Sequence, residues 1–282
     1  WMFASELLPI AVFLVLIAFL PQSPRWLASR DRAAEALAVL TRVDGPEFAR
    51  AEMALIQAGL EEEEGRFSDL FAPGIRYAFL IGLLLAFFNN WTGWSVMGGY
   101  ITMLIESSGL NDRALAILQY AVSYGFMGVV TLVACWIVDR AGRRPLWLGA
   151  SALMCVIMAL TGAVFHFQLS GWIVLLVIIL CTVPHGLALG PLPWLMMSEL
   201  FPTRLRGRAV SLNTAFLWVT IYSGAQLFPI ISDYSNRKIG SIGGTFWLLS
   251  AICVLAFLFG LFMLPETKGR TLEEIAASWK RK

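Results

Sequence analysis

The chain has 282 residues, of which 58% are hydrophobic, 13% aromatic and only 14% charged. Soluble domains usually carry about 25% charged residues, so this composition argues against a water-soluble globule. A net charge of +2, with no long basic tract, argues against a nucleic-acid partner. The composition therefore predicts an all-α membrane protein that crosses the bilayer several times.

Apolar residues form seven blocks, each close to the roughly 20 residues that a helix needs to cross a bilayer. The blocks cover residues 1–20, 77–104, 114–138, 145–165, 172–196, 209–231 and 244–264. The last six contain no Asp, Glu, Lys or Arg, as expected where inserting a charge costs about 2.5–3.5 kcal/mol. The first block begins abruptly at Trp1, unlike a signal peptide, and we expect the sequence to be truncated there.

A polar stretch, residues 21–76, follows the first block and predicts a helical insert in water. Residues 31–43 and 46–64 have the composition of helices, and Asp44-Gly45-Pro46 between them indicates a turn. Lys and Arg number 18 in the stretches 21–76, 139–144, 197–208 and 265–282, against three in the opposite loops. This bias predicts that the insert and the C-terminal tail are both cytoplasmic. Residues 77–264, which lie between them in the sequence, are expected to form a six-helix bundle.

Cysteine and histidine residues do not have the spacing of a metal site. His166 and His185 have no further imidazole or thiolate ligand nearby in the sequence. The cysteines have no C-x-x-C spacing and are typical of small hydrophobic residues in helices; they are Cys135, Cys155, Cys181 and Cys253. We therefore expect neither a metal nor a cofactor.

Four segments at the predicted cytoplasmic ends of the spans combine acidic residues with arginines. They read PQSPRWL at 21–27, DRAGRR at 139–144, SELFPTRLRGRA at 198–209 and PETKGRTLEEI at 265–275. Any one of them alone could simply set the topology of a loop or end a helix. Their order along the chain resembles the sugar porters of the major facilitator superfamily, as do NWTG at 90–93 and GPLPW at 190–194.

This resemblance implies the C-terminal half of a twelve-helix transporter, with the N-terminal half of the same transporter as its partner. Two six-helix bundles would rock around a central solute site by alternating access. Charged residues at the cytoplasmic helix ends would hold the inner gate closed, and the matching positions are Arg25, Asp139, Arg143, Arg144, Glu199, Arg206 and Glu266. Gln22 stands where the family usually has Glu, so one contact of the gate should be weaker.

Polar residues inside the predicted spans are candidates for solute binding. Asn89, Asn90 and Thr92 lie in the block 77–104, and each amide offers donors and an acceptor that suit sugar hydroxyls. Hydrogen bonding between helices is the alternative for these residues. Helical spacing also predicts that Asn90, Trp94 and Met97 share one face.

The resemblance adds further pocket residues and shows departures from ordinary hexose porters. Ser95 stands at a family Asn, and Trp194 and Trp218 match an aromatic wall against the sugar ring. The paired Gln of the family are here the shorter Asn89 and Asn90. Trp94 stands at a family Ile, Leu217 stands at a family polar amide, and a second polar amide of the family falls at about Met127. Fewer and shorter hydrogen-bonding groups suit a smaller, less hydroxylated or modified solute.

His185 is the imidazole that lies well inside a predicted span, before Gly186 and Gly190. It is a candidate proton-linked group, since an ionisable residue in a span is by default a functional candidate. Hydrogen bonding across a tight helix contact is the alternative.

Three other classes of protein have to be weighed. A seven-span photoreceptor is disfavoured because no span holds a Lys, and an intramembrane hydrolase because the spans hold no paired Asp and no His placed to activate a serine. A carrier of a non-sugar solute, such as a polyol or an organic ion, remains open. We expect a transporter of a sugar-like solute in the plasma or inner membrane, and no enzyme.

Overall fold

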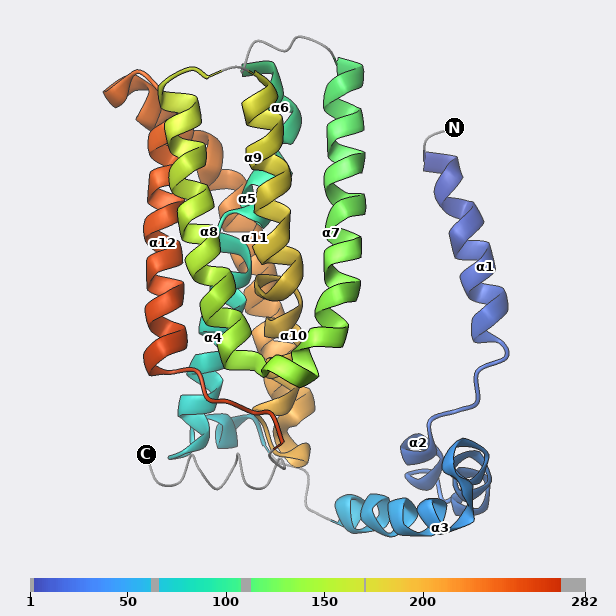
Figure 1. The fold of residues 1–282 in the computed structure, drawn as a ribbon. Helices are drawn as coiled ribbons and strands as arrows, with labels where there is room; N and C mark the ends of the chain where they lie inside the picture. The colour runs from blue at the N-terminus through green and yellow to red at the C-terminus, as the bar shows by residue number, and fades with distance from the viewer. Residues whose placement is uncertain (1–2, 62–65, 108–112, 170, 270–282) are drawn as a thin grey trace. The chain divides into compact units, whose positions relative to one another are not determined.

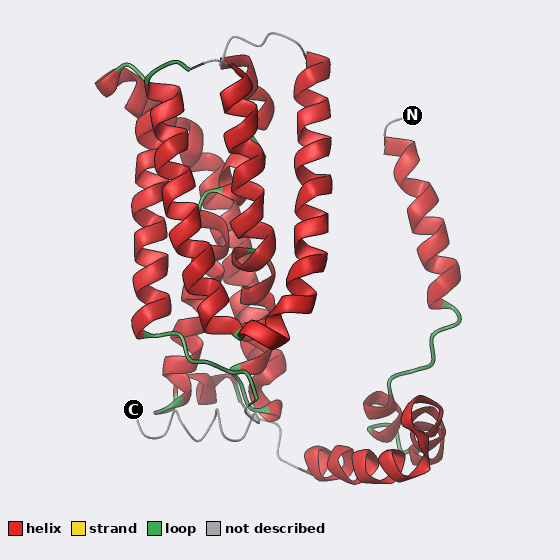
Figure 2. Ribbon diagram, in the orientation of Figure 1, coloured by secondary structure: helices red, strands yellow, loops and turns green. Residues whose placement is uncertain are grey.

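The structure is a computed structural model that describes residues 3–61, 66–107, 113–169 and 171–269. Within these ranges all regular secondary structure is helical, as Figure 2 shows, so the all-α prediction is confirmed. The chain divides into two compact units, Trp1–Glu64 and Gly65–Lys282.

The first unit contains one apolar helix and a small helical domain. Its elements are η1 (Phe3–Glu6), α1 (Leu7–Ile17), α2 (Pro24–Ala28) and α3 (Ala33–Glu61). α1 has 11 residues with exposed side chains, so the helix is shorter than the predicted span over 1–20. α3 runs through both predicted helices and is kinked at the predicted turn, where Gly45 has a φ of 86°. α2 and α3 bury a small core of Leu27, Ala36, Leu40, Ala49 and Met53.

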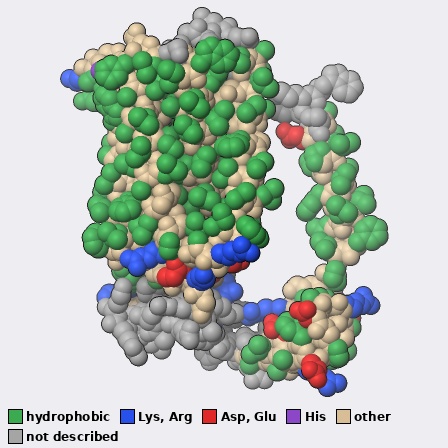
Figure 3. Space-filling view, viewed as in Figure 1, with side chains coloured by type: hydrophobic (Ala, Val, Ile, Leu, Met, Phe, Trp, Pro, Cys, Tyr) green, Lys and Arg blue, Asp and Glu red, His purple; other side chains and the backbone are tan. Residues whose placement is uncertain are grey.

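The second unit is a bundle of six apolar helical segments, each long enough to cross a membrane (Figure 1). Its elements are η2 (Phe67–Phe71), α4 (Ile75–Trp91), α5 (Trp94–Gly98), α6 (Ile101–Ser107), α7 (Arg113–Ala141), α8 (Arg143–His166), α9 (Gly171–Pro184), η3 (His185–Leu189), α10 (Pro191–Glu199), α11 (Thr203–Ile239) and α12 (Gly243–Phe262). These segments correspond to the last six predicted blocks, which are therefore confirmed. Figure 3 shows hydrophobic side chains over the face of the bundle and charged side chains gathered at one end.

Two of the six segments are interrupted in the middle. The first is broken between α4 and α5 at Gly93, whose φ of +120° lies in a region that favours glycine. The predicted common face of Asn90, Trp94 and Met97 crosses this break, and all three residues are buried. The second segment passes from α9 to α10 through η3, which is a π-helix.

The packing divides the bundle into a covered part and an exposed part. α8 and α12 bond to each other reciprocally, because the indole N–H of Trp147 donates to Ala256 O at 2.9 Å and that of Trp247 to Ala159 O at 3.2 Å. In contrast, only 11% of the apolar stretch of α7 and 22% of that of α11 is buried inside the bundle. The corresponding share is 44% or more in the other four described spans. α7 and α11 therefore have the largest uncovered faces among the described spans.

Candidate functional site

The turn between α7 and α8 positions the charged residues at one end of the bundle. Gly142 separates the two helices with a φ of +88°, which again favours glycine. A Cβ atom at Gly142 would lie 2.7 Å from Oε2 of Glu266, so the close approach of this carboxylate also requires glycine. The sequence DRAGRR therefore places Asp139 on the last turn of α7 and Arg143 on the first turn of α8.

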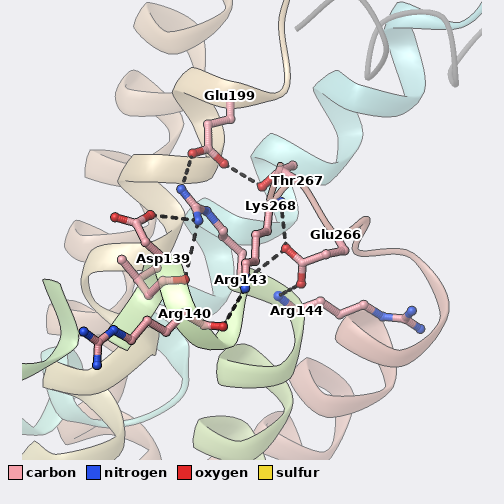
Figure 4. A network of polar contacts seen from close by, with 9 residues as sticks. Asp139, Arg140, Arg143, Arg144, Glu199, Glu266, Thr267 and Lys268 are labelled. Carbon is pink, nitrogen blue, oxygen red and sulfur yellow. Dashed lines mark hydrogen bonds and ion pairs between the residues drawn. The ribbon is translucent and has the colours of Figure 1, made fainter. Parts of the chain in front are cut away.

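Arg143 is the centre of this end of the bundle (Figure 4). Its Nη2 donates to Oε1 of Glu199 at 2.9 Å, and its Nη1 to Oδ1 of Asp139 at 3.1 Å. The side chains of Arg143 and Glu199 are 12% and 23% exposed, whereas that of Asp139 is 76% exposed. Because exposed ion pairs contribute only about 0–1 kcal/mol, the contact with Glu199 is the stronger of the two.

Glu266 caps the N-terminus of α8 from the segment after α12. Its carboxylate accepts hydrogen bonds from the backbone N–H groups of Arg143 and Arg144, both at 3.1 Å, and of Lys268 at 2.9 Å. A carboxylate is stabilised at a helix N-terminus because free N–H groups and the helix dipole meet it there. Partial burial would raise the pKa of Glu266, but these backbone hydrogen bonds outweigh it and lower the pKa.

The two residues after Glu266 attach the same segment to other helices. Thr267 donates its hydroxyl to Oε2 of Glu199 at 2.6 Å, and Lys268 donates its Nζ to Arg140 O at 2.6 Å. Three consecutive residues therefore bind the ends of α8, α10 and α7 (Figure 4). We call this set the charged cluster; it consists of Asp139, Arg140, Arg143, Glu199, Glu266, Thr267 and Lys268.

The other predicted gate residues lie in different places. Arg144 contributes its backbone N–H to Glu266, while its side chain donates to Gly260 O at 3.2 Å and Leu261 O at 2.6 Å, near the end of α12. Arg206 is partly buried near the start of α11. Arg25 lies on α2 in the other unit. Thr267 and Lys268 were missed, although they are inside the motif that marked Glu266.

The middle of the bundle contains the interrupted segment from α9 to α10. Its backbone lacks N–H donors at Pro184, Pro191 and Pro193. The N–H of Gly190 donates to His185 O at 2.7 Å, five residues back, which is the π-helical pattern. Carbonyl groups here lose their usual helical donors, and buried carbonyls need others.

Asn89 of α4 supplies one of the replacement donors. Its Nδ2 lies 2.9 Å from both Leu189 O and Gly190 O. Leu189 O would accept from residue 193 in an α-helix, but Pro193 has no N–H. Asn89 is 6% exposed, and its Oδ1 accepts no hydrogen bond from the described residues. Both N–H groups of the amide are therefore bonded within the bundle, whereas its oxygen can still accept.

The neighbouring amide, Asn90, connects α4 to α11. Its Nδ2 donates to Oγ1 of Thr220 at 2.9 Å, and the residue is 1% exposed. This is a hydrogen bond between helices, the alternative that the sequence had left open. Thr220 was not identified from the sequence, because a Thr in an apolar block gives no sign of the helix that it faces.

Thr92 and Ser95 lie on the two sides of the break at Gly93. Thr92 is fully buried and donates to Phe88 O on its own helix at 2.8 Å. Ser95 is exposed and donates to Asn89 O at 3.3 Å. Of the two residues, only Ser95 presents a hydroxyl at the surface of the bundle.

The predicted aromatic residues are distributed between the surface and the core. Trp194 on α10 is 45% exposed and Trp218 on α11 is 63% exposed, so both rings have free faces. Trp94 is only 2% exposed, and the ring of Tyr124 lies over it with a centroid distance of 5.7 Å. Trp94, one of the departures from the family pattern, therefore lies in the core of the bundle.

His185 is the first residue of the π-helix and is 8% exposed. Its Nδ1 has no hydrogen-bond partner among the described residues, and its ring lies 6.5 Å from that of Trp94. A Cβ atom at Gly190 would lie 3.1 Å from its Nε2, so this glycine gives the imidazole its space. The described residues contain no group of His, Cys, Asp and Glu that could hold a metal ion.

Comparisons with known proteins identify the family of this chain. The family model described as "Sugar (and other) transporter" matches residues 1–279. The chain is 36% identical to the arabinose-proton symporter of Bacillus subtilis (strain 168), over 99% of the chain and 59% of that protein. It is 30% identical to the D-xylose-proton symporter of Escherichia coli (strain K12), over 99% of the chain and 57% of that protein.

A solved structure gives the same result for the fold. The proton:xylose symporter XylE of the major facilitator superfamily, bound to 6-bromo-6-deoxy-D-glucose, matches with a TM-score of 0.84 and 30% identity. The match covers 99% of this chain and 58% of XylE. The chain thus spans somewhat more than half the length of the transporters it matches. It is a multi-pass integral membrane protein that belongs to the sugar porter family of the major facilitator superfamily.

Proposed function

We propose that the protein to which this chain belongs carries a sugar, or a sugar-like polar solute, across a membrane by alternating access. The matched relatives are symporters of arabinose and xylose, so a pentose is the first solute to test. The chain supplies one wall of the solute site and part of the gate. No covalent chemistry and no cofactor enter this proposal.

One observation carries the proposal: α10 bears a candidate solute contact near its start and a gate residue at its end. Trp194 presents a free indole face, and Glu199 pairs with Arg143 at 2.9 Å. The two residues are five apart, which is about 7.5 Å along a helix. A displacement of this short helix by bound solute therefore also strains the ion pair.

The charged cluster is the inner gate in this proposal. The bias of Lys and Arg supports a cytoplasmic position for this end of the bundle, with the insert 21–76 and the tail on the same side. In this proposal, the assembled charged cluster is the closed form of the gate. Arg25 and Arg206 are proposed members, and Gln22 weakens the contribution of the insert because it is neutral.

A second six-helix bundle of the same transporter is the proposed partner. The faces of α7 and α11 are the least buried of the described spans. Partner helices and lipid would cover them and would enclose Trp194 and Trp218 at the centre. This arrangement makes the solute site incomplete in the chain alone.

The polar groups left for solute are few. Both candidate amides use their donors inside the protein, so the available groups are Asn89 Oδ1, Ser95 Oγ and the indoles of Trp194 and Trp218. Such a wall favours a ring that stacks on aromatics and makes few hydrogen bonds. For this reason a polyol or an organic ion is retained as the second candidate cargo.

His185 is the proposed proton-linked group of this chain. It is buried at the start of η3, between α9 and α10, and its Nδ1 has no hydrogen-bond partner among the described residues. Replacing it with Gln should flatten the dependence of uptake on external pH. An unchanged pH profile in the His185→Gln variant would remove His185 from the proposal.

The test uses the full-length parent protein in proteoliposomes with labelled arabinose or xylose. Trp194→Ala should raise the KM for uptake while the amount of inserted protein stays constant. Trp172→Ala is the matched control, since Trp172 is 68% exposed at the other end of α9. Equal KM values for both variants would contradict the proposed site, and competition by polyols or organic ions but not by sugars would select the second cargo class.

A further inference from the structure

The π-helix between α9 and α10 leaves a carbonyl without a main-chain donor. Gly186 O would accept from Gly190 in an α-helix, but the N–H of Gly190 is bonded to His185 O at 2.7 Å. The next N–H along, which a π-helix would use, belongs to position 191, and Pro191 has none. Gly186 O is therefore deprived of both kinds of helical donor by local sequence.

A side chain from α7 fills this vacancy. Oγ1 of Thr131 lies 3.2 Å from Gly186 O and can donate to it. The approach is possible because Gly186 has no side chain: a Cβ atom there would lie 3.1 Å from Met127 O and 3.2 Å from a methyl group of Val130. Thr131 thus meets the π-helix from α7, while Asn89 meets its end from α4.

We propose that Thr131 is a positioning residue for Trp194, acting through the register of the π-helix. A π-turn contains one residue more than an α-turn, and one residue corresponds to a rotation of about 100° and a rise of about 1.5 Å. Losing the π register would rotate α10 by that amount and turn the Trp194 ring away from the proposed solute site. A donor that satisfies Gly186 O only in the π register stabilises that register. This inference rests on the proposed role of Trp194 as a solute contact.

The hydroxyl of Thr131 has a second acceptor, which defines the competing explanation. Oγ1 also lies 2.9 Å from Met127 O on its own helix, the usual local bond of a helical Thr. A hydroxyl has one proton, so it serves one acceptor at a time or shares the proton between the two. If the local bond were its whole role, removing the hydroxyl would affect only α7.

The experiment is a double-mutant cycle on KM in the full-length protein, in the same proteoliposomes. Thr131→Val removes the hydroxyl and should raise KM about two- to tenfold, the range expected for one hydrogen bond. Thr131→Ser keeps the hydroxyl and should restore most of the affinity. Thr161→Val is the control, because Thr161 makes the same local bond on α8, to Ile157 O at 2.8 Å, and its hydroxyl contacts Cys181 of α9 rather than a carbonyl of the π-helix.

The cycle separates positioning from a general structural effect. If Thr131 acts through Trp194, then Thr131→Val should not raise KM further in a Trp194→Ala background, since coupled residues are non-additive. An equal effect in both backgrounds, or no effect of Thr131→Val, overturns the inference. Should Thr131→Val not reach the membrane, Thr131→Ala takes its place in the cycle.

A structural readout completes the test. Hydrogen exchange of residues 185–194 in purified protein should speed up in Thr131→Val and stay unchanged in Thr161→Val; equal exchange in both overturns the inference. A silent Trp194→Ala would remove the proposed solute site and this inference with it. A Trp194→Ala effect together with a silent Thr131→Val would remove this inference alone.

Discussion

Arg143 and Glu199 are 56 residues apart, yet Nη2 of the arginine lies 2.9 Å from Oε1 of the glutamate and joins α8 to α10. Both side chains are mostly buried, and both carboxylate oxygens of Glu199 are used, one by Arg143 and one by Thr267. In the proposed gate, opening this end of the bundle would break two hydrogen bonds to one charged group. Each such bond contributes about 1.5–3 kcal/mol, enough to bias a conformational equilibrium.

Replacing Glu199 with Gln should open the gate. The variant keeps the shape of the side chain but removes the charge that pairs with Arg143, and the closed form should lose about 1.5–3 kcal/mol. The measurement is maleimide labelling of Ser198→Cys in the full-length protein, with the exposed Cys135 replaced by Ser. Asp139→Asn is the matched control, with an expected effect of about 0–1 kcal/mol because Asp139 is 76% exposed. Equal labelling of Glu199→Gln and the unmodified parent would contradict the gate.

Glu266 should make the stability of the charged cluster depend on pH. Its pKa is lowered because its backbone hydrogen bonds outweigh partial burial, so its contribution is present above the ordinary Glu value of about 4.3 and is lost as pH falls through the lowered value. The melting-temperature difference between the parent and Glu266→Gln should be constant above about pH 5 and shrink below about pH 4. A difference that grows on acidification would show that the carboxylate is not stabilised in its charged form.

Asn213 offers a test in the contact between α4 and α11. The residue is fully buried against Gly82, and both polar atoms of its amide lack partners among the described residues. An apolar residue of similar shape avoids this cost, so Asn213→Leu should raise the stability by about 1–3 kcal/mol. Asn90→Leu, which removes the bond to Thr220, should lower the melting temperature in the same helix contact. A destabilised Asn213→Leu would indicate a bound water at the amide.

Gly93 should not tolerate a side chain. Its φ of +120° is unfavourable for other residues, and a Cβ atom would overlap the side chain of Met158, so Gly93→Ala should cost about 1–3 kcal/mol and reduce the amount of inserted protein. Gly99→Ala is the control, because Gly99 has a φ of −69° and open space around it. Similar yields of the two variants, measured by fluorescence-detected chromatography, would contradict the strained break.

The sequence predicted most of the architecture because the bilayer restricts the choices. Uninterrupted apolar blocks of about 20 residues have few alternatives to a spanning helix, and the six blocks from residue 77 onwards agree with the structure within a few residues, apart from longer ends at α11. Four members of the charged cluster were identified from the sequence, because Asp139, Arg143, Glu199 and Glu266 lie in motifs at helix ends that resemble those of the family. Their partners were not, and the role of Thr267 emerged only from the distance to Glu199.

The sequence alone determined that this chain spans a membrane and that charged residues lie at the ends of its helices. Tertiary structure alone decided what the polar side chains in the middle do. Adjacent asparagines look equivalent in sequence, but Asn89 faces a carbonyl that Pro193 leaves unbonded and Asn90 faces Thr220 of α11. The physical reason is that hydropathy and helical period act along the chain, whereas a hydrogen-bond partner is chosen by rotation and contact between helices distant in sequence.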